Sequence, residues 1–151
     1  MELEHDFVKE PELRNADLER FELVSPHKQI KEDFWATCVK VHDGDTITLR
    51  TDFRDFDFPL RLLDIDTKEM SEGGAEARDW LKAQILGEEV YIQINRLNRV
   101  EKWGRLLGHV ISKGMNMNEA LVSIGLAVPF KVRREEQIPN IGKILDVKQW
   151  F

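Results

Sequence analysis

The chain has 151 residues, a formal net charge of −6 and a pI near 5.3. Hydrophobic residues make up 42% of it and charged residues 33%, the balance of one globular domain, and no apolar run is long enough to cross a bilayer. The first residues are acidic and lack the pattern of a secretion signal, so we expect a cytoplasmic protein, or one whose export segment precedes these residues.

Acidic residues are concentrated at the start of the chain. Residues 1–33 contain ten acids and five bases, a net charge of −5, so the remaining 118 residues carry a net charge of −1. Strong acidity argues against nucleic acid as a partner because lysine and arginine supply most of the affinity for phosphate, but residues 34–151 are nearly neutral. We therefore divide the chain into an acidic N-terminal extension, 1–33, and one domain, 34–151.

Within the extension, residues 12–23 lie between two prolines and predict a short helix, since Leu13, Leu18 and Phe21 approximate one face. Two roles for the extension stay open. Its apolar residues pack on the rest of the protein, or its acids cover basic groups as a mimic of nucleic acid. The basic groups concerned are Lys102, Arg105, Lys131, Arg133 and Arg134.

Cysteine and histidine give no sign of a soft-metal site. Cys38 is the only cysteine, so neither an internal disulfide nor a thiolate cluster can form, and its strand-like surroundings predict a buried thiol. The four histidines show no paired spacing of the kind that predicts zinc. Even His42, beside an acidic turn, is expected to be structural or solvated.

Two strand-like runs, 34–41 and 46–51, flank the acidic cluster His-Asp-Gly-Asp-Thr at 42–46. An Asp-Gly pair between such runs is a strong signal of a β-hairpin. Residues 52–55 are polar and predict the next turn. The acids Asp43 and Asp45 are therefore expected at the tip of the first hairpin.

A third run, Arg61 to Asp66, brings a cation and carboxylates together. Its residues alternate with the period of a strand, the odd-numbered ones facing one way and the even-numbered ones the other, so one strand is expected to end near Asp66. Glu69 follows in a stretch without apolar residues that leads into a turn. It should lie on a loop at the mouth of this strand, and loops held by rigid strands commonly carry catalytic residues.

The second half of the chain mixes helix and strand signals. Residues 74–86 have apolar side chains at helical spacing and end at Gly87, a common helix stop. The further elements are expected as strand 89–94, loop 95–104, strand 106–112, a helix capped by Asn116 or Asn118 that runs to Ile124, and a third helix or packed tail over 141–147.

Five residues from these segments suit phosphoryl chemistry. Hard cations need several oxygen ligands, and reactions at phosphate need fixed positive groups over the developing charge. Asp45, Asp66 and Glu69 offer the oxygens, while Arg61 and Arg105 offer the positive charge. The alternative for each motif alone is that Asp-Gly-Asp is only a turn and that the arginines form surface ion pairs.

The ordered set of motifs resembles the staphylococcal nuclease (thermonuclease) family. The matching motifs are Asp43-Gly44-Asp45-Thr46, Arg61-Leu62-Leu63 with Asp66-Thr67 and Glu69, Lys102-Trp103-Gly104-Arg105, and Asn118-Glu119-Ala120-Leu121-Val122 with Gly125-Leu126-Ala127. The resemblance implies an α+β fold, mainly β, with a five-stranded OB-type barrel and two to three helices. It also implies calcium-dependent hydrolysis of phosphodiester bonds in DNA and/or RNA that leaves 3′-phosphate ends.

The resemblance also implies a ligand set for Ca²⁺. Asp45 and Asp66 match the family's calcium carboxylates, Thr67 matches the residue that gives its backbone carbonyl, and Asp43 matches an acid of the outer shell. Such an irregular set of oxygens suits calcium better than magnesium, which demands a tighter octahedron.

The catalytic positions implied by the resemblance are Arg61, Glu69 and Arg105. Glu69 matches the general base or water-orienting group, and the two arginines match those that bind the reacting phosphate. Lys102 and Trp103 match a lysine-tyrosine pair that holds the other phosphate of the nucleotide. The tryptophan either stacks on a base or packs against its own loop.

Some residues depart from the family pattern. Lys68 stands where proline is usual, Asp64 replaces an apolar residue, and Lys131 and Arg133 replace an aromatic pair. The loop after Glu69 is also shorter than in the secreted prototype. A non-catalytic nucleic-acid- or peptide-binding module on the same barrel is therefore the alternative function, and a monomer is expected in either case.

Overall fold

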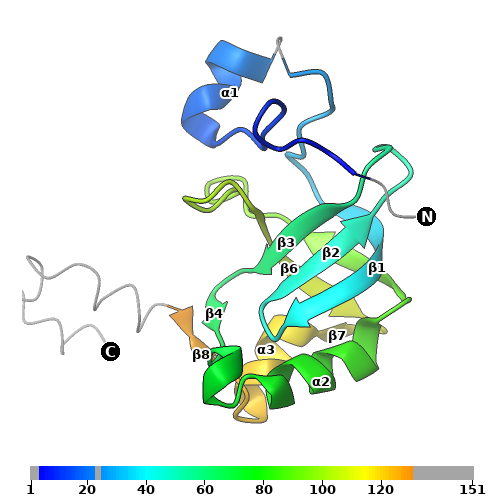
Figure 1. The fold of residues 1–151 in the computed structure, drawn as a ribbon, viewed down its shortest axis with the longest axis vertical. Coiled ribbons are helices and arrows are strands. Elements are labelled where there is room, and N and C mark those ends of the chain that lie inside the picture. Colours follow the sequence, from blue (N-terminus) through cyan, green and yellow to red (C-terminus); the bar gives the residue numbers. More distant parts are fainter. Residues whose placement is uncertain (1–3, 23–24, 131–151) are drawn as a thin grey trace, which may run out of the picture.

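The computed structural model describes residues 4–22 and 25–130 as a barrel of strands, with two helices at one end and the N-terminal segment at the other (Figure 1). The strands are β1 (Phe34–Asp43), β2 (Thr46–Arg50), β3 (Phe58–Leu62), β4 (Ile65–Asp66), β5 (Glu89–Gln93), β6 (Leu106–Ser112), β7 (Met115–Asn116) and β8 (Val128–Pro129). The α-helices are α1 (Asn15–Phe21), α2 (Ala75–Ile85) and α3 (Met117–Ser123), and a short 3-10 helix at Met70–Glu72 precedes α2.

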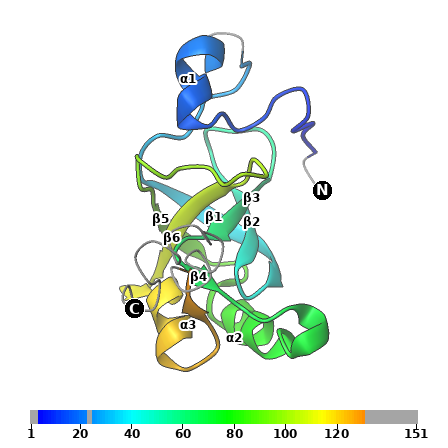
Figure 2. The ribbon, with the colours of Figure 1, turned by 90° about the vertical axis from the view of Figure 1, so that its left-hand side faces the viewer.

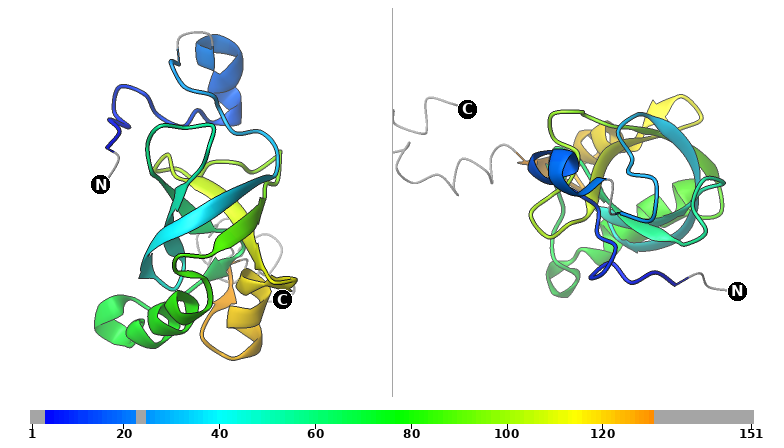
Figure 3. Two further views of the ribbon diagram at one scale, coloured as in Figure 1. Left: turned by 90° about the vertical axis from the view of Figure 1, so that its right-hand side faces the viewer. Right: turned by 90° about the horizontal axis from the view of Figure 1, so that it is seen from above.

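Five strands close into the barrel in the order β3, β2, β1, β5 and β6, because β3 also pairs in parallel with β6. Seen from above, the strands form a ring (Figure 3). Alternate side chains of each strand fill its interior, among them the fully buried Ile47, Leu49, Leu60 and Ile92. The expected α+β fold, mainly β and built on an OB-type barrel, is confirmed together with its helices.

The two helices below the barrel bury the faces that their apolar spacing predicts. Helix α2 packs against β1 and buries Ala77, Leu81 and Ile85. Helix α3 packs against β6, and the side chain of Asn116 caps it by accepting a hydrogen bond from the Glu119 N–H. Within the described ranges, no helix has the length and apolar character needed to span a membrane.

The other candidate cap, Asn118, has a different role. Its buried side chain accepts a hydrogen bond from the Val110 N–H at 3.0 Å and donates to the carbonyl of Leu63 at 2.8 Å. It therefore joins β6 to the turn that follows β3, next to the acidic residues. The basic stretch 131–134 and the third helix expected over 141–147 lie outside the described residues.

The prediction of one strand through Asp66 is wrong. Strand β3 ends at Leu62, a turn follows at residues 63 and 64, and β4 pairs with β8 instead of continuing along the barrel. Asp64 adopts a left-handed backbone conformation with a φ of 67°, which an aspartate tolerates better than most residues but which ends a strand. Period-two spacing alone gave no sign of this break.

Two buried arginines attach the N-terminal extension to the rest of the protein. Arg54, after β2, forms a buried ion pair with Glu12. Arg99, in the loop before β6, donates to the carbonyls of Ile30 at 2.8 Å and Leu13 at 3.0 Å. The extension therefore lies over the barrel end opposite α2 and α3 and contacts the loop over 95–105 (Figure 2).

The predicted helix of the extension is present as α1, but its predicted face does not attach it. Leu13 is buried, yet it precedes the helix, while Leu18 is half-buried and Phe21 is exposed. The arginine contacts and the burial of Leu13 hold this segment instead. Polar contacts of the two arginines therefore attach the extension, and not the apolar helix face that the spacing predicted.

Candidate active site

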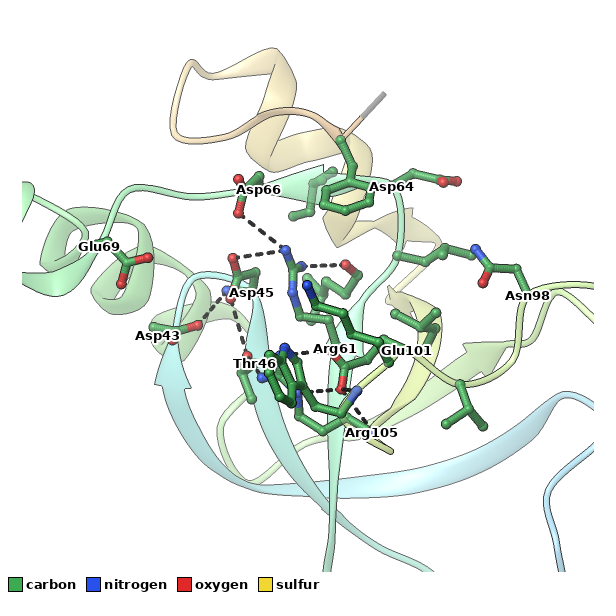
Figure 4. Close-up of a pocket in the computed structure, with 18 residues that line it drawn as sticks. Asp43, Asp45, Thr46, Arg61, Asp64, Asp66, Glu69, Asn98, Glu101 and Arg105 are labelled. Atoms are coloured by element: carbon green, nitrogen blue, oxygen red, sulfur yellow. Dashed lines mark hydrogen bonds and ion pairs between the residues drawn. The ribbon is translucent and has the colours of Figure 1, made fainter. Parts of the chain in front are cut away.

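A pocket of about 620 Å³ lies between the first hairpin, the β3–β4 turn and the loop before β6 (Figure 4). It is lined by acids, by Arg61 and Arg105, and by an apolar floor that includes Leu62 and Leu107. All of the residues expected from the sequence line it except Thr67, which donates two hydrogen bonds to Asp45. Those lining residues are Asp43, Asp45, Arg61, Asp66, Glu69, Lys102, Trp103 and Arg105.

Asp45 lies in the pocket because the tip of the first hairpin packs closely against Thr67 and α2. A Cβ at Gly44 would lie 2.6 Å from the Ala77 Cβ and 2.9 Å from a Thr67 methyl group, so only glycine fits between the tip and α2. The Asp45 carboxylate then accepts hydrogen bonds from the Thr67 N–H at 3.2 Å and the Thr67 hydroxyl at 3.1 Å. Thr67 thus orients Asp45 rather than lining the pocket itself.

Arg61 lies between the two acids expected to bind metal. Its Nη2 is 3.4 Å from Asp45 Oδ2 and 3.3 Å from Asp66 Oδ1, and its Nη1 donates to the Leu62 carbonyl at 2.8 Å. The guanidinium also lies over the ring of Phe130, 5.9 Å from its centroid. The positive charge of Arg61 therefore holds the two carboxylates in one place.

Asp43 and Asp45 respond differently to their surroundings. Burial and the hydrogen bond to Asp45 raise the pKa of Asp43 to about 6. Burial would also raise the pKa of Asp45, but hydrogen bonds from Asp43 and Thr67 and the charge of Arg61 lower it. Asp43 is therefore the first of the two to take up a proton as the pH falls toward 6, while Asp45 stays ionised.

Arg105 is oriented by Glu101, which the sequence pattern did not indicate. The Glu101 carboxylate accepts hydrogen bonds from Arg105 Nε at 3.2 Å and Nη2 at 3.1 Å, and also from the backbone N–H of Trp103 at 3.1 Å. The remaining Arg105 nitrogen, Nη1, donates to the Thr46 hydroxyl at 3.2 Å. The one sequence feature that could have indicated this pair is the spacing of four residues between an acid, Glu101, and a base, Arg105.

Glu69 lies at the edge of the cluster, near Asp43 in the view of Figure 4. It is exposed, and its carboxylate makes no hydrogen bond or ion pair with any residue in the described ranges. Its backbone is fixed all the same, since the Glu69 carbonyl accepts from the N–H groups of Glu72 and Gly74. A Cβ at Gly74 would lie 2.2 Å from the Lys68 carbonyl, so this turn requires glycine.

Lys102 and Trp103 form the outer wall of the pocket. The Trp103 side chain is 75% exposed, and the Lys102 ammonium lies 5.2 Å from the centroid of its ring. Packing of Trp103 against its own loop is therefore not what the structure shows. An exposed indole with a cation beside it suits a base and its phosphate.

The pocket holds groups of the kinds that can bind and polarise a phosphate diester. The carboxylates of Asp45 and Asp66 are oxygen ligands of the kind that calcium prefers, and the two arginines can each donate parallel hydrogen bonds to phosphate. Glu69 adds an exposed carboxylate to the lining of the pocket. The predicted residues thus converge from three separate segments of the chain.

Two comparisons of the sequence with known proteins gave matches. A family model described as "Staphylococcal nuclease homologue" matches residues 59–148. An uncharacterized protein from Bacillus anthracis is 30% identical over 95 residues, which is 58% of this chain and 44% of that protein. The chain thus spans less than half the length of this relative.

Proposed function

Because the chain belongs to the staphylococcal nuclease family, we propose that it is a calcium-dependent nuclease that hydrolyses phosphodiester bonds in DNA and/or RNA and leaves 3′-phosphate ends. The observation that carries this proposal is the convergence of Arg61, Arg105 and three carboxylates in one pocket. A binding module needs positive charge for phosphate, but it has no use for acids beside that charge.

The carboxylates of Asp45 and Asp66 would hold the calcium ion, with the Thr67 carbonyl as a further ligand and Asp43 in the outer shell. When bound, the ion supplies positive charge next to a phosphate oxygen. The donor set fits, since both carboxylates face one point that the Arg61 guanidinium now occupies. A cation there would replace the contacts of Arg61 and let it turn toward the phosphate.

Each of the remaining site residues then has its own role in the reaction. Glu69 orients the attacking water and takes its proton, for which an exposed carboxylate with no ion-pair partner among the described residues is suited. Arg61 and Arg105 donate hydrogen bonds to the phosphate oxygens, where negative charge builds in the transition state. Lys102 and Trp103 position the adjoining nucleotide at the outer wall.

The proposal is tested by digestion of end-labelled DNA and RNA with calcium, with magnesium and with a chelator. Cleavage should be faster with calcium than with magnesium and absent with the chelator. Asp45→Ala and Arg61→Ala should each lower the rate by on the order of a hundredfold or more, whereas Arg20→Ala, a charge loss on α1, should not. Binding of nucleic acid by the parent without cleavage under any of these conditions would favour the non-catalytic module.

A further inference from the structure

Two histidines and a glutamate meet on the N-terminal extension, outside the proposed active site. One ligand atom from each of His5, Glu10 and His27 lies within 4.8 Å of the others, and no other group of this kind occurs in the described ranges. Glu10 Oε2 is 3.5 Å from His5 Nδ1 and 3.9 Å from His27 Nδ1. The sequence spacing concealed this cluster because α1 separates His27 from the other two.

His5 is already arranged as a metal ligand is. Its Nε2 lies 2.9 Å from the carbonyl of Glu10, so Nε2 carries a hydrogen, and in the neutral ring Nδ1 has a lone pair that faces the Glu10 carboxylate. Metal-binding histidines usually donate their second ring nitrogen to a carbonyl or carboxylate in this way. The backbone turn at residues 6–10 therefore fixes both the ring and its tautomer.

His27 supplies an independent observation. Its side chain is only 7% exposed, and its buried Nδ1 has no hydrogen-bond partner although it points toward Glu10. Buried polar atoms are nearly always paired, so a ring nitrogen that faces a carboxylate without a hydrogen bond is available to exchange its hydrogen for a metal ion. The Glu10 side chain, 37% exposed, leaves the cluster open to solvent on one side.

Aromatic packing holds both rings in place. His5 stacks on Phe56 with centroids 3.5 Å apart, and His27 meets the same ring edge-on at 5.1 Å. Phe56 is buried in the core of the barrel. Contact with this buried ring restricts the movement of both imidazoles. A preformed metal site requires ligands that are held in place in this way.

We propose that His5 Nδ1, His27 Nδ1 and Glu10 Oε2 bind one zinc ion, with water as the fourth ligand. Nitrogen and carboxylate ligands in tetrahedral arrangement are typical of Zn²⁺, and a bond length near 2.1 Å places ligand atoms about 3.4 Å apart. The two separations from Glu10 Oε2, 3.5 and 3.9 Å, need to shorten by only a few tenths of an ångström, and the two histidines have a ligand atom each within 4.8 Å of one another. The ion would link residues 5 and 10, which precede α1, to residue 27, which follows it.

One contact must change when zinc binds. Gln29 Nε2 lies 3.2 Å from His27 Nε2 and donates to it, which places the hydrogen of His27 on Nδ1. Binding through Nδ1 moves that hydrogen to Nε2, where an acceptor is then needed. Gln29→Glu provides the acceptor and should tighten zinc binding several-fold, as a carboxylate behind a ligating histidine does.

The test is a titration of the full chain with zinc chloride, in millimolar calcium so that the active-site carboxylates are occupied. We expect one zinc per chain with a Kd of about 1 µM or tighter, and a rise in Tm of roughly 5–10 °C when zinc exceeds that Kd a hundredfold. Glu10→Gln keeps the size of the side chain and should abolish the rise without changing Tm in chelator. His42→Gln, a histidine that bonds Thr48 on the barrel, is the matched control and should keep it.

Three results would overturn the proposal. One is no zinc binding by the parent at about 10 µM or below. Another is zinc binding that persists in both Glu10→Gln and His27→Gln but is lost in Asp45→Ala, which would assign the ion to the other site. The third is a Tm that falls in Glu10→Gln equally with and without zinc, which would show that the cluster is packing alone.

Discussion

Replacing Arg105 by alanine should lower kcat/KM for nucleic acid by on the order of a hundredfold while leaving the protein folded. The loss corresponds to about 2.7 kcal/mol of transition-state stabilisation. It follows from the geometry: Glu101 and Thr46 hold three nitrogens of the guanidinium, and together they aim it into the pocket beside Asp45.

The same substitution should have a small effect on stability. The pair of Arg105 with Glu101 is partly exposed, 34% and 16% by side chain, so solvent screening limits its contribution to about 1 kcal/mol or less. For a chain of this size that is a Tm change of roughly 2–4 °C. Activity and stability are therefore expected to separate clearly.

The assay is initial-rate cleavage of end-labelled single-stranded DNA in calcium, with Tm measured on the same preparations. Arg105→Lys keeps the charge but loses the two parallel hydrogen bonds, so its rate should lie well below the parent's. Arg20→Ala controls for net charge. If Arg105→Ala cuts as fast as the parent, the assignment of this arginine to the phosphate is refuted.

Three other changes test separate parts of the site. Trp103→Phe should raise KM several-fold with little change in kcat, because stacking of the exposed indole on a base contributes roughly 1–3 kcal/mol; an unchanged KM would contradict this. Gly74→Ala should lower kcat without removing any catalytic side chain, because its Cβ would displace the backbone at Glu69; activity equal to the parent's would show that Glu69 tolerates movement. Burial, followed by the charge of Arg54, lowers the pKa of His27 in the folded protein. Below pH 6.5 the unfolded chain therefore takes up more protons than the folded protein, so Tm measured in chelator should fall as the pH is lowered below 6.5. His27→Gln should make that fall shallower, and an equal slope would assign the effect to other groups.

Much of the fold was accessible from the sequence because its signals are local. Asp-Gly at 43–44 marks the first hairpin, the spacing in 74–86 marks α2, and Gly87, with a φ of 77°, stops it. The strand break at Asp64 was missed because alternation continued through it, while a single left-handed residue redirected the chain. Local pattern does not report such a residue when its type is not glycine.

The candidate site was accessible for a different reason, and only in part. Its residues, Thr67 among them, were found through ordered motifs, but the motifs did not show which groups orient the acids and the arginines. Glu101, which aims Arg105, and Thr67, which donates twice to Asp45, act through contacts that only the fold reveals. The cluster of His5, Glu10 and His27 is formed by tertiary packing, so the spacing of these residues in the sequence does not predict it.

The measurement that tests the central claim most directly is the fate of a 5′-labelled oligonucleotide incubated with the parent protein in calcium and, in parallel, in chelator. We expect calcium-dependent fragments whose ends change mobility after phosphatase treatment, as 3′-phosphates do, and we expect Glu69→Gln to lose these fragments. An intact oligonucleotide in calcium, or equal cleavage by Glu69→Gln, would contradict the proposed function.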